Sequence, residues 1–427
     1  MNIRYFCFLM LDRGNMIKNQ MNEIKRANED DVFAQKLHEK CVSNLIQHVK
    51  ETVPFYQNIT ATKLEDFPVV NKVMMKEDMS RFRSSEKLKI GKVRHTSGST
   101  GIPFEILQDV RKAKRIQAEV VYYRSIVGDE LGNKFINLIS PSRMEKVSKI
   151  SEYMQNVISV DVTKMDSDTM ERLHKALKKN HSIRYMIGYE SALEKIANYF
   201  LEKGYKDCSS LKAIVSSSEI LTDVTIQKLT SVFGCPVYDR YSNEDNGFIA
   251  QTDGTSHDFL VNRASFYIEI LKMNSDEPAQ ENELGRIVIT DYYNYAQPFL
   301  RYDTGDLGAY SYKKVNGAKR YVLTKMAGRI SDIVYDMDDR PVSTFAIGCA
   351  LEVFSKIKQY QLIQNTKSDF DLNIIDPLKQ YDSSNYQKAL EDVLGKGIHV
   401  KVSYLDCLPT LNSGKFKRVI CNYKPEN

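Results

Sequence analysis

The chain has 427 residues, of which 42% are hydrophobic and 27% charged, a balance that is ordinary for a globular protein with two or three domains and a sizeable core. Its net charge of +5 is small for this length, and no stripe of lysine and arginine with interleaved aromatic residues stands out, so nothing supports nucleic-acid binding. The seven cysteines are scattered without a C-x-x-C pair. This pattern favours neither a disulfide framework nor a zinc site, and it fits reduced thiols in the cytoplasm.

The first apolar segment is Tyr5–Leu11, which Asp12 and Arg13 terminate. A bilayer-spanning helix needs about 20 apolar residues, and this segment has seven. We therefore expect a buried N-terminal segment and no membrane span. Met1 and Met16 both stay open as the start of the protein.

Beyond this segment, hydrophobic periodicity predicts a helix and then an alternation of strands and helices. Apolar residues at steps of four predict an amphipathic helix over residues 30–50, and residues 67–79 fit a short strand or turn followed by a helix. Ser191–Lys203 has the spacing of a helix, with Gly204 as its stop. Buried strands are expected at Lys134–Ser140, Ile183–Ile187, Leu211–Ser216 and Val237–Tyr238. This alternation predicts an α/β sheet with helices on its faces, followed from Gly285–Thr290 by a β-rich, barrel-like subdomain.

The pattern changes after Gly328. Residues 345–358 and 384–394 have helical spacing, whereas residues 360–364, 370–374 and 398–404 read as strands. These elements predict a compact α+β domain of ordinary size at the C-terminal end of the chain.

A run rich in glycine and hydroxyl residues lies at His95–Ile106, which reads HTSGSTGIPFEI. Glycine lets the backbone approach a ligand closely, and hydroxyl and amide groups donate hydrogen bonds to phosphate oxygens. A P-loop NTPase would carry lysine and a hydroxyl residue after its second glycine, and no lysine follows Gly98 or Gly101. The run therefore predicts a phosphate loop of another kind.

Three further signatures follow the loop in order: Tyr302–Asp306 (YDTGD), Ala327–Asp332 (AGRISD) and Leu408–Arg418 (LPTLNSGKFKR). The series resembles the adenylate-forming superfamily of acyl-CoA synthetases over most of the chain. Residues 298–306 (PFLRYDTGD) resemble its phenylacetate-CoA ligase branch, and Tyr241–Gln251 resembles its CapK-like members in capsular polysaccharide biosynthesis. The resemblance implies a large N-terminal α/β adenylation domain over residues 1–329 and a small α+β lid domain over residues 330–427.

The resemblance also implies an ATP site built from several motifs. It assigns the phosphates of ATP to Thr96, Ser97, Gly98, Ser99, Thr100 and Gly101, and it assigns adenine and ribose to Ser218, Glu219, Tyr241, Asp306 and Arg329. A carboxylate such as that of Asp306 can accept hydrogen bonds from both ribose hydroxyls. Lys415 matches the catalytic lid lysine that bridges the substrate carboxylate and the α-phosphate, a task suited to a compact charge on a flexible stem.

The chain departs from the family pattern in three places. Phe104 stands where a lysine usually follows the proline of the phosphate loop. The alignment places Asp245 at the metal carboxylate, which is usually a glutamate, and neighbouring Glu244 is the alternative ligand for Mg²⁺. The hinge position holds Ser331 instead of the usual aspartate or lysine, with Asp332 next, so the pivot stays open between these two residues.

The function predicted from these residues is that of an ATP- and Mg²⁺-dependent enzyme. It would activate a small carboxylic acid as an acyl-adenylate and transfer the acyl group to CoA, with a role in surface polysaccharide biosynthesis. Two alternatives stay open: transfer to an amine or hydroxyl acceptor such as an amino sugar, and an inactive nucleotide-binding scaffold. The acyl pocket is expected near Ile139–Arg143 and Gly188–Ser191, which name no acid. The oligomeric state stays open, with a homodimer included.

Overall fold

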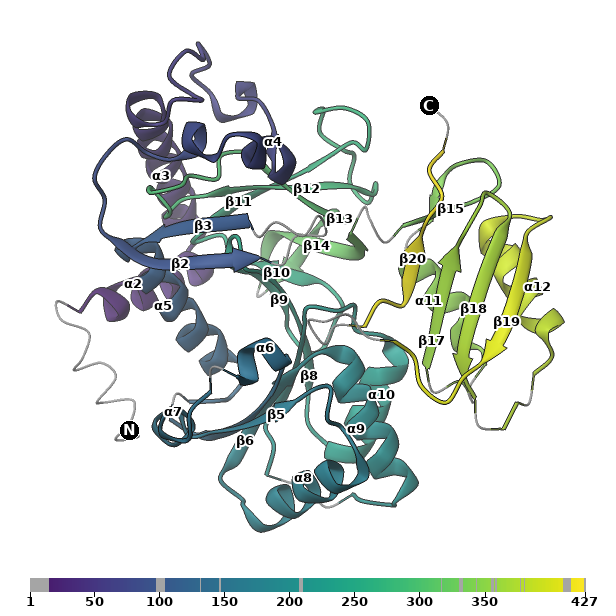
Figure 1. The fold of residues 1–427 in the computed structure, drawn as a ribbon. Helices are drawn as coiled ribbons and strands as arrows, with labels where there is room; N and C mark the ends of the chain where they lie inside the picture. Colours follow the sequence, from purple (N-terminus) through teal and green to yellow (C-terminus); the bar gives the residue numbers. More distant parts are fainter. Residues whose placement is uncertain are drawn as a thin grey trace.

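The computed structural model describes residues 15–96, 104–130, 132–145, 147–206, 210–315, 317–329, 333–342, 344–354, 357, 359–376, 378–379, 381–409 and 416–425. The expected buried segment Tyr5–Leu11 lies outside these residues. Figure 1 shows a large body formed by the chain as far as β14 and, beside it, a smaller unit formed by the C-terminal residues.

The large body is organised around one 12-stranded sheet. Five parallel strands form one half of it: β5 (Val157–Asp161), β4 (Lys134–Ile139), β6 (Ile183–Gly188), β7 (Ala213–Ser217) and β8 (Val237–Asn243). Three helices pack on these strands through one apolar cluster: α8 (Ser167–Lys179), α9 (Glu190–Glu202) and α10 (Asp223–Phe233). The predicted alternation of strands and helices is confirmed.

The other half of the sheet is antiparallel. Its strands follow β8 in the order β9 (Gly247–Thr252), β10 (Phe259–Val261), β14 (Ala318–Arg329), β13 (Tyr302–Val315), β12 (Gly285–Asp291) and β11 (Phe266–Leu271). This is the predicted β-rich region, and it is continuous with the α/β half. The order of the described strands ends at β5 and β11, so the expected barrel-like closure is not formed among them.

N-terminal helices cover the large sheet. α2 (Met16–Glu29), α3 (Asp31–Thr52) and α5 (Val110–Ile126) contribute to an apolar cluster with residues of β9 and of the segment after β12. The predicted helix over residues 30–50 is confirmed as α3, whose N-cap Asp30 accepts a hydrogen bond from the Phe33 amide at 2.9 Å. No described helix has the length and apolar character needed to cross a membrane.

Short elements connect these helices to the sheet. β1 (Val70–Asn71) pairs in parallel with β13 and continues into α4 (Lys72–Glu77). The antiparallel hairpin of β2 (Ile90–Thr96) and β3 (Phe104–Asp109) precedes α5. α6 (Pro141–Met144) and α7 (Lys149–Gln155) follow β4.

The C-terminal unit has a sheet of its own. Its four strands are ordered β19 (His399–Tyr404), β18 (Asp369–Ile375), β17 (Gln359–Gln364) and β20 (Val419–Cys421), and α11 (Thr344–Glu352) and α12 (Ser383–Leu394) accompany them. The α+β pattern expected from the sequence is confirmed, although α11 ends six residues before the predicted Lys358. β20 was not predicted, because three residues are too few to show a periodicity. The apolar core of this unit is formed by residues between Val334 and Cys421.

Candidate active site

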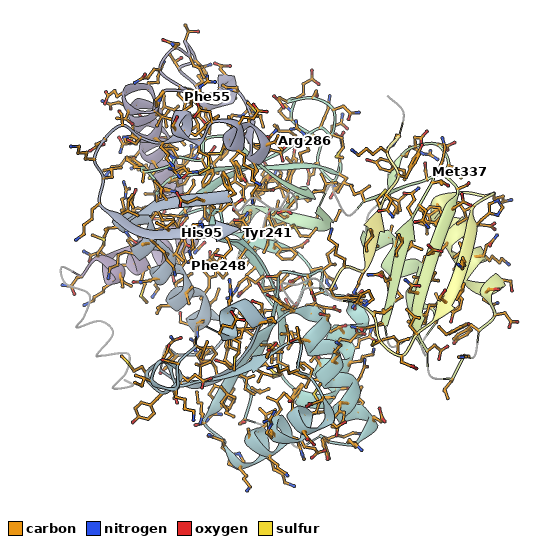
Figure 2. The ribbon with its side chains drawn as sticks, in the orientation of Figure 1. Phe55, His95, Tyr241, Phe248, Arg286 and Met337 are labelled. Atoms are coloured by element: carbon orange, nitrogen blue, oxygen red, sulfur yellow. The ribbon has the colours of Figure 1, made fainter. Side chains whose placement is uncertain are left out.

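The predicted phosphate loop lies at the tip of the β2–β3 hairpin. Thr96 ends β2 and pairs with Phe104 at the start of β3. The other loop residues, Ser97, Gly98, Ser99, Thr100 and Gly101, lie outside the described residues. The hairpin reaches β8, since Arg94 Nη1 donates to Glu244 Oε2 at 3.0 Å, and Figure 2 marks His95 at the hairpin end and Tyr241 on β8.

Two predicted nucleotide-binding side chains, Tyr241 and Asp306, meet in the structure. The Tyr241 hydroxyl donates to Asp306 Oδ2 at 2.8 Å, although the residues are 65 positions apart in sequence. Asp306 follows Gly305, whose φ of +74° favours glycine, and it pairs across the sheet with Arg329 on β14. The sheet therefore presents an aromatic ring and a carboxylate at one place. The ring can stack on a base, and the carboxylate can accept hydrogen bonds from sugar hydroxyls.

The serine-rich turn after β7 lies beside this pair of residues. Ser218 has a φ of +74°, an uncommon conformation for a residue other than glycine. The preceding Ser217 hydroxyl lies 3.4 Å from that of Ser242 on β8. The carboxyl ends of neighbouring parallel strands meet at one edge of an α/β sheet, where such folds bind ligands.

The adjacent carboxylates Glu244 and Asp245 have different surroundings. Glu244 accepts hydrogen bonds from Arg94 and Arg143, so two guanidinium groups neutralise it. Asp245 is buried, and its Oδ2 accepts a hydrogen bond from the Tyr302 hydroxyl at 2.8 Å. Its Oδ1 lies 3.9 Å from Lys72 Nζ, which is too long for a hydrogen bond.

Carboxylate oxygen is the ligand that Mg²⁺ takes in ATP sites, usually one or two groups together with phosphate oxygens and water. Asp245 fits this requirement, because Lys72 Nζ lies 3.9 Å from its Oδ1 and forms no hydrogen bond there that a metal ion would have to replace. Glu244 fits it less well, because an ion there would have to displace two arginines.

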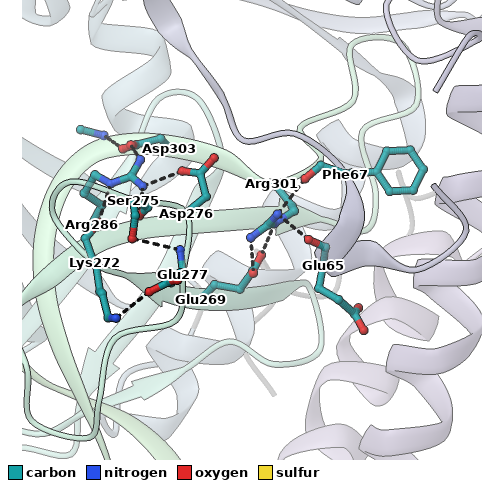
Figure 3. Close-up of polar contacts among 11 residues, drawn as sticks. Glu65, Phe67, Glu269, Lys272, Ser275, Asp276, Glu277, Arg286, Arg301 and Asp303 are labelled. Atoms are coloured by element: carbon teal, nitrogen blue, oxygen red, sulfur yellow. Dashed lines mark hydrogen bonds and ion pairs between the residues drawn. The ribbon is translucent and has the colours of Figure 1, made fainter. Parts of the chain in front are cut away.

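Arg301 and its neighbours in the PFLRYDTGD motif support the site from behind. Arg301 has a φ of +48°, and its guanidinium donates from Nη1 to the carbonyls of Glu65 and Phe67, both at 2.7 Å, and from Nη2 to Glu269 at 2.9 Å (Figure 3). These bonds join β13 to β11 and to the segment that leads into β1. A guanidinium group suits this position, because its several donors bind three separate parts of the chain at once.

Arg286 provides a second clamp. Its Nη1 donates to Asp303 Oδ2 at 2.8 Å, and its Nη2 donates to Asp276 and to the Ser275 carbonyl, both at 2.7 Å (Figure 3). Asp303 is paired with Asn71 of β1 and lies three residues before Asp306. The sequence analysis missed Arg286 and Glu269, because neither lies in a motif and only strand pairing brings them to β13.

Glu219, a predicted nucleotide contact, is half-buried and accepts hydrogen bonds from backbone amides through both of its carboxylate oxygens. Its Oε2 accepts from the Ser191 amide at 2.8 Å, and its Oε1 accepts from the Phe416 amide at 2.9 Å. Phe416 belongs to the C-terminal unit, so Glu219 connects the two bodies at the edge of the site. The predicted catalytic Lys415 and the predicted hinge residues Ser331 and Asp332 lie outside the described residues, as does the side chain of Arg329.

Comparison with known proteins identifies the family relationship. The profile of the CapK C-terminal domain matches residues 334–422. Protein CapK of Staphylococcus aureus is 23% identical over 435 aligned positions, which cover 95% of this chain and 93% of CapK. The chain is therefore similar to CapK along nearly its whole length. The relationship predicted from the motifs is thus confirmed.

Solved structures show the fold of this chain. The crystal structure of 2-hydroxyisobutyryl-CoA ligase in the postadenylation state, with R3-HIB-AMP, superposes with a TM-score of 0.72 at 17% identity, covering 93% of this chain and 92% of that one. The same ligase in the thioesterification state gives a TM-score of 0.56 with 93% and 90% coverage. The amide bond synthetase McbA from Marinactinospora thermotolerans gives 0.55 at 15% identity, with 83% and 70% coverage. The predicted α/β fold with a small C-terminal domain is confirmed.

Proposed function

We propose that this protein is an AMP-forming ligase that activates a small carboxylic acid with ATP. The observation that carries the proposal is the meeting of Tyr241 and Asp306 next to the end of the β2–β3 hairpin. In this proposal Tyr241 stacks on adenine, Asp306 binds the ribose hydroxyls, and the loop from Thr96 to Gly101 binds the phosphates. Ser218 and Arg329 complete the nucleoside contacts from β7 and β14.

Adenylation brings two anions together, so cations must neutralise the charge that builds on the α-phosphate in the transition state. We assign this role to Lys415, which directly precedes Phe416, and the amide of Phe416 binds Glu219 in the large domain. Asp245 would hold a Mg²⁺ ion, with Glu244 as the alternative, and the ion would neutralise phosphate charge. Arg94 and Arg143, which surround Glu244, add positive charge at the same place. The PFLRYDTGD residues hold Asp306 in position.

The second step transfers the acyl group from the adenylate to an acceptor. We take CoA as the acceptor, since the structural neighbour with a TM-score of 0.72 is a CoA ligase, and its structure in the thioesterification state holds 2-HIB-AMP and CoA. An amine acceptor is the second candidate, because McbA has the same fold and is an amide bond synthetase. We further propose a reaction in surface polysaccharide biosynthesis, in the cytoplasm where ATP is available, as the resemblance of Tyr241–Gln251 to CapK-like members implies.

A screen of pyrophosphate release tests the proposal. The full-length protein would be incubated with ATP, Mg²⁺ and a panel of carboxylic acids, with and without CoA, and products identified by mass spectrometry. We expect acid-dependent pyrophosphate from at least one chemical class of acid, with acyl-CoA formed when CoA is present. Pyrophosphate with no use of CoA but with an amide formed from an added amino sugar would favour the amine acceptor. ATP binding in calorimetry with no pyrophosphate from any acid would support the inactive nucleotide-binding scaffold, and failure to bind ATP would overturn both readings.

A further inference from the structure

One contact between the two domains lies at the start of α9. Figure 1 shows the C-terminal unit standing beside α9 and α10, with the chain before β20 reaching back to the large body. Arg418 lies in this stretch, directly before β20. Its guanidinium enters the large domain, where Nη2 lies 2.6 Å from Glu190 Oε2, 2.8 Å from Glu190 Oε1 and 3.1 Å from Glu194 Oε2.

The backbone of Arg418 is fixed in the other domain. Its carbonyl accepts a hydrogen bond from the Leu362 amide of β17 at 2.8 Å, and the carbonyl of the preceding Lys417 accepts from Gln361 at 3.0 Å. Arg418 therefore bonds to the large domain through its side chain and to the C-terminal domain through its main chain. Any rotation of the C-terminal unit must break the ion pairs of Arg418.

The two glutamates require a cation. Glu190 is fully buried and Glu194 nearly so, and they lie four residues apart on one face of α9. Glu194 has a second partner in Lys228 at 3.1 Å, whereas Glu190 has Thr225 Oγ1 at 2.7 Å besides Arg418. Removing the cation from a buried, hydrogen-bonded ion pair is strongly unfavourable. The remaining partners, however, reduce that cost when the C-terminal unit leaves.

The arrangement of the two domains agrees with one state of a solved relative. The same ligase, covered over the same 93% of this chain, superposes with a TM-score of 0.72 in its postadenylation state and of 0.56 in its thioesterification state. The Arg418 contacts are thus contacts of an arrangement closer to the postadenylation state than to the thioesterification state.

We propose that Arg418 is a positioning residue of the proposed adenylation reaction: its ion pairs with Glu190 and Glu194 hold the C-terminal domain in the adenylation arrangement and so place Lys415 at the α-phosphate. The inference rests on the proposed function. Glu219 acts with Arg418, because it binds the amide of the residue that follows Lys415. Acyl transfer then needs these ion pairs to open, so their strength sets the balance between the two half-reactions.

Hydrogen exchange of the full-length protein without substrates tests the contact itself. In Arg418→Gln we expect faster exchange in peptides that cover the start of α9 and β20, because the Ser191 and Phe416 amides lose the docked domain that protects them. Arg418→Lys should restore part of the protection, and Glu194→Gln should lose less than Arg418→Gln. The matched control is Arg340→Gln, which removes an exposed arginine of the C-terminal domain whose ion pairs with Asp336 and Asp338 lie within that domain. Unchanged exchange in Arg418→Gln would overturn the proposal.

The half-reactions separate a positioning role from a structural one. With an acid found in the pyrophosphate screen, Arg418→Gln should lower adenylation by about tenfold or more, while transfer from a pre-formed acyl-adenylate stays within about twofold of the unmodified protein. Equal losses in both steps would mean a structural role and would overturn the proposal. If the screen finds no acid, the proposed function fails, and the exchange experiment still decides whether Arg418 holds the domains together. Should Arg418→Gln not fold, Arg418→Lys and Glu194→Gln carry both measurements.

Discussion

The two sides of the candidate active site are held by different kinds of contact. Asp306 stands on β13, which pairs with β12, β14 and β1 and is clamped from behind by Arg301 and Arg286. The C-terminal unit has its own apolar core, and it meets the large domain through polar contacts such as those of Arg418 and Phe416 and through a small apolar cluster that includes Tyr335. Strand pairing and buried arginine clamps hold the nucleotide side, while ion pairs that can open form part of the contacts on the lid side. The difference suits a protein that binds a nucleotide on a rigid wall and brings a cation to it by closure.

The largest effect should follow removal of the lid cation. Lys415→Ala should lower acid-dependent pyrophosphate release by about 10²–10³-fold, the usual loss for one group that stabilises transition-state charge, while ATP affinity in calorimetry changes little. Lys417→Ala, two residues away, is the matched control and should retain most activity. Near-normal adenylation by Lys415→Ala would show that this side of the site does not carry the chemistry.

The rigid side should respond to mutation by losing stability. Arg301→Gln removes the cation that pairs with the largely buried side chain of Glu269. The free energy of unfolding of the full chain, measured by urea denaturation, should therefore fall by about 3 kcal/mol. Arg340→Gln, at an arginine whose own side chain is exposed, should cost under about 1 kcal/mol. Equal free energies of unfolding in the two variants would show that the hydrogen bonds of Arg301 do not stabilise the fold.

The Mg²⁺ concentration that the reaction needs should distinguish Asp245 from Glu244 as the metal ligand. Asp245→Asn should raise the Mg²⁺ concentration needed for half-maximal pyrophosphate release by about tenfold, because Asp245 Oδ1 is the oxygen that an ion can reach. Glu244→Gln should raise it less and should instead weaken ATP binding, since Arg94 and Arg143 lose their shared partner. The reverse order would move the metal to Glu244, and no change in either variant would mean that this segment is misaligned.

The smallest effect is expected at the hinge. Ser331→Pro fixes φ at one backbone position and should slow the second half-reaction severalfold more than the first, because only the second step follows domain rotation. The rates are measured as pyrophosphate release and as transfer from a pre-formed acyl-adenylate. Unimpaired rates in both steps would place the pivot elsewhere, with Asp332 as the next position to test.

Local pattern was enough for much of the architecture. The alternation of strands and helices over residues 134–238 and the helix α3 depend on periodicity within short stretches, and they appear where the sequence predicts them. The sequence does not show that the β-rich strands join the same sheet, because the pairing of β8 with β9 and of β10 with β14 depends on contacts far apart in the chain. The β1 strand has two residues and exists only because β13 lies beside it.

The sequence by itself determined which chemical groups are available: a loop of glycines and hydroxyls, a tyrosine, two adjacent carboxylates, the YDTGD motif and a lysine after Gly414. Only the tertiary structure decided how these groups are used. Glu244 and Asp245 are adjacent carboxylates that the sequence does not distinguish. In the structure Glu244 contacts two arginines, whereas Asp245 contacts a tyrosine and a lysine from distant segments. Arg418 likewise looks like one more charge after a lysine until folding places it against Glu190, 228 positions away. Burial and pairing depend on where distant segments pack, and a local pattern carries no record of that.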